Sequence, residues 1–77
     1  MRITDVLKTN TGDVLALCMG NDIDAGFSCS KILANGREYG VLKTDVMMSF
    51  SGNMCAMMIM ATKEPSDVPR GPFTILQ

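Results

Sequence analysis

The feature that most constrains the fold is a run of seven apolar residues, Met54 to Met60, in a chain of 77 residues. Seven residues is strand length, and Gly52 in the preceding Ser51-Gly52-Asn53 suits the positive φ of a tight reversal. Alternation along a strand directs Met54, Ala56, Met58 and Met60 to one side and Cys55, Met57 and Ile59 to the other. Both sides are apolar, so the strand is either buried on both faces or offers one face to a partner.

Length and charge limit what the chain can be. The 77 residues predict a single domain, 1–77, with 47% hydrophobic and 19% charged residues. A net charge of −1 argues against non-specific electrostatic binding to nucleic acid or to an anionic membrane. No apolar run approaches the roughly 18–20 residues that span a bilayer, and Met1 to Asp5 leads into no signal-peptide core. We therefore expect a cytoplasmic protein without a membrane segment.

The cysteines indicate neither a disulfide framework nor a metal site. Cys18, Cys29 and Cys55 are odd in number, form no Cys-x-x-Cys pair and have no histidine to complete a zinc site. Each lies in an apolar run, which favours buried reduced thiols. We expect no cofactor and no metal.

Turn signals divide the chain into short strands. Strands are predicted over residues 2–8, 14–19, 27–34, 37–44, 54–60 and 73–76, with the alternating run Val46, Met48, Phe50 leading up to Gly52. Three prolines between residues 65 and 72 exclude a helix and a central strand there, and no segment shows helical periodicity. This pattern predicts an all-β fold, a small closed or nearly closed antiparallel β-barrel of about six strands.

Asn35-Gly36 predicts a hairpin with a two-residue type I′ turn. In that register Ala34 faces Arg37, Ile32 faces Tyr39, Ser30 faces Val41 and Ser28 faces Lys43. We assign to the core the hairpin face whose phase continues through Val46 and Met48. That face holds Phe27, Cys29, Leu33 and Leu42, with Lys31, Glu38, Gly40 and Thr44 among them. Lys31, a charged residue opposite Gly40, does not fit this assignment.

The order of these features resembles the second domain of translational GTPases, the β-barrel that follows the G domain in elongation factor Tu and its relatives. The residues that carry the resemblance are Gly12-Asp13-Val14-Leu15, Ala25-Gly26, Asn35-Gly36, Gly52-Asn53 before Met54 to Met60, and Asp67-Val68-Pro69-Arg70-Gly71 before Phe73-Thr74-Ile75-Leu76. The resemblance implies a translation-factor domain-2-like barrel and suggests contact with RNA or the ribosome. The chain contains no G-x-x-x-x-G-K-[ST] loop, so no GTP binding of that kind is expected.

Two patterns that resemble metal motifs lack the geometry of a site. Met54 and Met57, like Met57 and Met60, have the M-x-x-M spacing of copper(I) ligands, but residues three apart in a strand point to opposite faces. Asp22-x-Asp24 would need glycine and glutamate at later loop positions to bind calcium, and Phe27 and Leu33 occupy those positions. Core filling and an adaptable apolar surface remain as two roles for the methionines.

Three functional hypotheses follow, in this order. The first is a non-catalytic binding module that acts through Cys55, Met57 and Ile59 and self-associates. The second is RNA- or ribosome-associated binding through Arg37, Tyr39 and Lys43, which regular alternation places on one outer hairpin face. The third is a cysteine-dependent enzyme, although the chain contains no histidine base.

Overall fold

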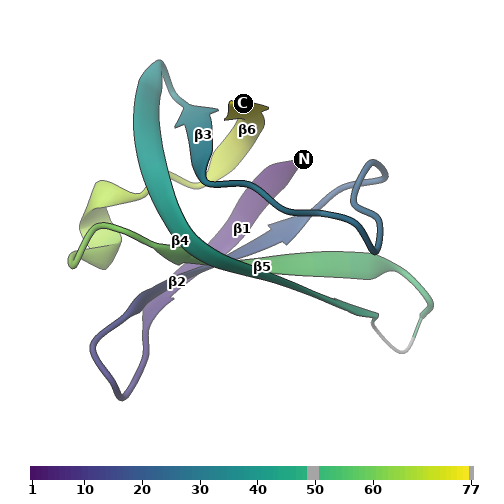
Figure 1. Ribbon diagram of the computed structural model, residues 1–77, viewed down its shortest axis with the longest axis horizontal. Helices are drawn as coiled ribbons and strands as arrows, with labels where there is room; N and C mark the ends of the chain where they lie inside the picture. The colour runs from purple at the N-terminus through teal and green to yellow at the C-terminus, as the bar shows by residue number, and fades with distance from the viewer. Residues whose placement is uncertain (49–50, 77) are drawn as a thin grey trace.

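The computed structural model describes residues 1–48 and 51–76 and forms a closed antiparallel barrel (Figure 1). Its strands are β1 (Arg2–Lys8), β2 (Val14–Met19), β3 (Lys31–Ala34), β4 (Arg37–Met48), β5 (Met54–Met60) and β6 (Gly71–Leu76), with a 3-10 turn η1 (Pro65–Asp67) before β6. Around the barrel the order is β1-β2-β5-β4-β3-β6, and short pairing between β1 and β6 closes it. The predicted six-stranded all-β barrel is confirmed.

Most of the predicted strands are present with small changes of boundary. β1, β2 and β5 lie where the sequence pattern put them, and β4 joins two predicted runs into one long curved strand that Figure 1 shows bending across the molecule. β3 begins at Lys31 rather than at residue 27, although the Ser30 carbonyl still accepts a bond from the Val41 amide at 2.9 Å. Phe50, at the end of the predicted alternating run, lies outside the described residues.

The prediction that the prolines exclude a helix and a central strand was wrong in two places. Pro72 lies near the start of β6, where it pairs with Arg2 of β1. Pro65 begins the three-residue 3-10 helix η1. Proline is tolerated at a first helical position, because its missing N–H would have no partner there in any case.

The hairpin turn is confirmed, and so is the register over Lys31 to Ala34, but Ser28 precedes β3 and does not pair with Lys43 as predicted. The predicted core face was also wrong within the hairpin. Asn35 and Gly36 have φ values of 53° and 78°, and Ile32 pairs with Tyr39. Ile32, Ala34 and Val41 are buried, whereas Leu33 and Leu42 are exposed. Lys31 is therefore on the outside, where its Nζ lies 3.3 Å from Oε1 of Glu38.

A bulge explains the wrong assignment. The pairing of β4 with β5 shifts between Val41, opposite Met60, and Lys43, opposite Ile59. The extra residue, Leu42, reverses the alternation, so the inward phase of Val46 does not extend back to Leu42. If the inward face is assigned by regular alternation from Val46, the assignment is therefore wrong for every strand residue before the bulge.

The barrel interior is filled by inward-facing residues of every strand and by residues of two connections. The buried set is Ile3, Val14, Ala16, Cys18, Ile23, Phe27, Ile32, Ala34, Val41, Ala56, Met58, Met60, Val68 and Phe73. Every one of these side chains is apolar. The inward half of the methionine-rich strand thus fills the core.

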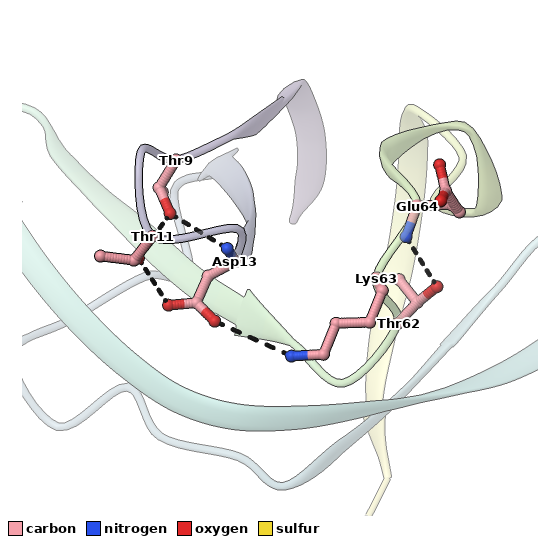
Figure 2. Close-up of polar contacts among 6 residues, drawn as sticks. All are labelled: Thr9, Thr11, Asp13, Thr62, Lys63 and Glu64. Atoms are coloured by element: carbon pink, nitrogen blue, oxygen red, sulfur yellow. Dashed lines mark hydrogen bonds and ion pairs between the residues drawn. The ribbon is translucent and has the colours of Figure 1, made fainter.

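A polar cluster fixes the turn between β1 and β2 (Figure 2). The hydroxyl of Thr9 accepts a bond from the amide of Asp13 at 3.1 Å, and the hydroxyl of Thr11 donates to Oδ2 of Asp13 at 3.1 Å. Oδ1 of Asp13 lies 4.0 Å from Nζ of Lys63, which follows β5. The cluster thereby links the β1–β2 turn to the chain that leaves β5.

Throughout residues 1–48 and 51–76, no helix is long and apolar enough to cross a membrane.

Candidate interaction surface

The structure decides which side of β5 faces inward. Ala56, Met58 and Met60 are buried, whereas Cys55, Met57 and Ile59 are half-buried and lie on the outer side of the barrel. The three residues predicted as an interface therefore share one outward face, and the other side of the strand serves as core.

Neighbouring strands extend this outward face on both sides. Across β2, β5 and β4, the paired residues form three rows: Met19, Cys55 and Met47; Leu17, Met57 and Asp45; Leu15, Ile59 and Lys43. The pairing of β1 with β2 adds Leu7 beside Leu15. We call Leu7, Leu15, Leu17, Met19, Met47, Cys55, Met57 and Ile59 the outer apolar face.

Several side chains of the outer apolar face are open to solvent. Leu7, Met19 and Met47 are 42%, 45% and 48% exposed, in a domain whose core already contains fourteen buried apolar residues. Large contiguous apolar patches on a protein surface mark interaction sites. The face is thus the strongest candidate site among the described residues.

The face contains a hollow at its edge with β4. A depression of about 130 Å³ is lined by Leu15, Lys43, Thr44, Asp45, Met57 and Ile59. Its lining combines aliphatic side chains with one cation and one anion. An apolar side chain from a partner could enter it while the charges meet polar groups at the rim.

The residues predicted to contact RNA do not share one face. The guanidinium carbon of Arg37 lies 5.8 Å from the centre of the Tyr39 ring, a cation–π contact. Tyr39 is opposite the buried Ile32 and packs against the core. Lys43 follows the bulge and is opposite the outward-facing Ile59, so the predicted common face of Arg37, Tyr39 and Lys43 was wrong.

The three cysteines are free thiols in different settings. Burial raises the pKa of Cys18 to about 12 and also raises the pKa of Cys29, whose Sγ lies 3.9 Å from Sδ of Met58. A thiol with a raised pKa is a poor nucleophile at neutral pH, because it is protonated. Cys55 lies on the outer apolar face, where its Sγ is 3.6 Å from the Met47 carbonyl.

Within the described part of the chain, no three acidic, cysteine or histidine side chains are grouped so as to hold a metal ion.

The interface predicted from the sequence includes only the β5 residues of the outer apolar face and omits their neighbours. Leu15, Leu17 and Met19 come from β2, and Leu7 and Met47 come from β1 and β4. One signal was available: Val14 to Met19 is apolar at every position, so that strand also has two apolar faces. That β2 lies beside β5 follows from the order of strands around the barrel. Neither apolar run, Val14 to Met19 or Met54 to Met60, indicates this order by its own sequence.

The fold and this surface define a class, a small closed six-stranded antiparallel β-barrel with one apolar outer face. Comparison of the chain with protein-family models, with curated proteins and with solved structures found no match.

Proposed function

We propose that this barrel is a non-catalytic binding module that buries its outer apolar face against a protein surface. The observation that supports the proposal is the continuity of apolar side chains over four adjacent strands, β1, β2, β5 and β4, outside a core that is already filled. Burial of such surface is favourable by about 25 cal/mol for each Å² removed from water. Met19, Met47 and Met57 suit this role, since the flexible thioether chain adjusts to the shape of a partner.

The size of the domain is compatible with such an interface. A standard interface covers about 800 Å² on each partner, which is about a sixth of the 4908 Å² of accessible surface of this chain. The outer faces of β1, β2, β5 and β4 supply a contiguous area, whereas a single exposed side chain elsewhere would not.

Site-specific photo-crosslinking tests the proposal. A photoreactive residue at position 19 should give discrete protein adducts, either with a second copy or with a protein in cell extract, and Met57→Lys should abolish them. The matched control places the same residue at position 33, because Leu33 is an exposed apolar residue on β3, away from the outer apolar face. Equal adducts from both positions, or adducts unaffected by Met57→Lys in a folded protein, would exclude this face as the site.

A second candidate function is RNA binding at the hairpin end of the barrel. It is favoured by the stacking of Arg37 on Tyr39 and by the resemblance of the sequence to the second domain of translational GTPases. An aromatic ring beside a cation can stack a base and neutralise a phosphate. Fluorescence anisotropy with bulk tRNA should then show salt-dependent binding that Arg37→Ala weakens. Because Lys43 lies on the other face, Lys43→Ala should change this binding little; no binding at low salt would reject the RNA function.

We also propose a reducing location such as the cytoplasm. The support is that Cys18, Cys29 and Cys55 are all free thiols, two of them partly accessible. Fractionation of cells that express the tagged chain would test it, and recovery of the protein outside the cytoplasmic fraction would contradict it.

A further inference from the structure

Two opposite charges lie side by side at the edge of the outer apolar face. Lys43 and Asp45 are two residues apart on β4, about 7 Å along the strand, and they pair with Ile59 and Met57 respectively. Both side chains are exposed. Among the ion pairs of residues 1–48 and 51–76, none involves either of them, and the Asp45 carboxylate only accepts the amide of Val46 at 2.9 Å. On the opposite edge of the face, Asp5 lies 3.8 Å from Arg70, and the exposed Arg2 is opposite Met19, in the row farthest from Lys43.

This arrangement of charges complements itself under a two-fold rotation. In a symmetric dimer, if one residue contacts another across the interface, the reverse contact is made as well. A two-fold axis that lies in the interface, perpendicular to the strands and between the rows of Met57 and Ile59, places Lys43 of one copy against Asp45 of the other. The same rotation places Met57 against Ile59 and Leu15 against Leu17 of the other copy. Two unpaired charges thereby become two reciprocal ion pairs beside an apolar centre.

We infer that the outer apolar face binds a second copy of this chain, with the strands antiparallel and with Lys43 and Asp45 paired reciprocally between the copies. This inference rests on the proposed function of the same face. The hollow of about 130 Å³ between Lys43, Asp45, Met57 and Ile59 lies at the proposed contact, and it would receive an apolar side chain of the other copy.

Charge also selects among the symmetric arrangements. A two-fold axis parallel to the strands and centred between β2 and β5 would bring Asp45 of one copy opposite Asp5 of the other, since both belong to the row of Leu17 and Met57. Like charges in an interface oppose association, and Arg70 beside Asp5 offsets only part of this repulsion. The same axis leaves Lys43 opposite Leu7, without an anion. The perpendicular axis avoids this contact and gives each Asp45 a cation.

Charge reversal with mixing tests the inference by sedimentation velocity. The protein should be dimeric at micromolar concentration, and Lys43→Glu or Asp45→Lys should each weaken the dimer at least tenfold, because each creates two like-charge contacts. An equimolar mixture of the two variants should recover the dimer, since both cross-pairs are then attractive. The double exchange Lys43→Asp with Asp45→Lys in one chain should recover it as well. Lys31→Glu, which reverses a charge on the β3 side, is the control that should leave the dimer unchanged.

The outcomes separate this inference from the proposed function. If the protein is a dimer that Met57→Lys disrupts but that the charge reversals leave unchanged, the face is an interface and the Lys43–Asp45 pairing is wrong. If the protein is monomeric and position 19 still gives crosslinks to another protein that Met57→Lys removes, the partner is not a second copy. If the protein is monomeric and position 19 gives no specific adduct, both the inference and the proposed function are rejected.

Discussion

Val41 and Lys43 lie on opposite faces of β4, although residues two apart in a regular strand share a face. Val41 is buried opposite Met60, and Lys43 is on the outside opposite Ile59. Leu42 is the inserted residue of the bulge, and it is 63% exposed. Because the alternation reverses at Leu42, this one residue determines which face of the hairpin packs into the core. It also places the charge of Lys43 on the outside of the barrel.

Because of the bulge, we expect the smaller side chain, Val41, to contribute more to stability than the larger side chain, Leu42. Val41→Ala should lower the free energy of unfolding by about 2 kcal/mol, because it removes buried methyl groups. Leu42→Ala should change it by less than about 0.5 kcal/mol, although leucine is the larger side chain. Urea denaturation of both variants measures the difference. A larger loss for Leu42→Ala would show that the alternation does not reverse at this position.

The two faces of β5 should respond differently to truncation. Met58 is fully buried, so Met58→Ala should cost about 2–5 kcal/mol through lost burial and the cavity left behind. Met57 is half-buried on the outer side, and Met57→Ala should cost about 1 kcal/mol or less in the isolated chain. Thermal or urea unfolding at low protein concentration, where association does not contribute, compares the two. Similar losses would mean that both faces of β5 are packed within one copy.

The hairpin turn should depend on glycine for backbone reasons alone. Gly36 has a φ of 78°, and a Cβ at this position would meet no atom within 4 Å. Gly36→Ala should therefore cost about 1–2 kcal/mol, the usual penalty of the left-handed region. Gly36→Asn should cost less, because asparagine tolerates that region. Equal stability of all three proteins in urea would contradict the turn geometry.

Burial of Cys18 should destabilise the fold in alkali. Its pKa is raised from 9.0 to about 12, so between these values the unfolded chain loses a proton that the folded chain keeps. The free energy of unfolding should therefore fall as pH rises through this window, by up to about 1.4 kcal/mol for each pH unit. Urea titrations from pH 8 to pH 11 would measure the slope. Cys18→Ala is the comparison, and an unchanged slope in that variant would show that another group is responsible.

Local patterns in the sequence determine much of this fold. The turn at Asn35-Gly36, the strand from Met54 to Met60 and the all-β class follow from glycine conformation and from runs of apolar residues of strand length. These signals depend only on neighbours in the chain. Cys55, Met57 and Ile59, the residues predicted as an interface, also share one side of a strand for that reason.

Tertiary structure decided what the local patterns leave open. Whether Met57 or Met58 faces inward depends on the closure of the barrel, because both sides of the run are apolar and only one side can face the interior. The bulge at Leu42 and the placement of β2 beside β5 join residues far apart in the sequence. Those pairings place Lys43 and Asp45 at the edge of a wide apolar face, which no local periodicity specifies.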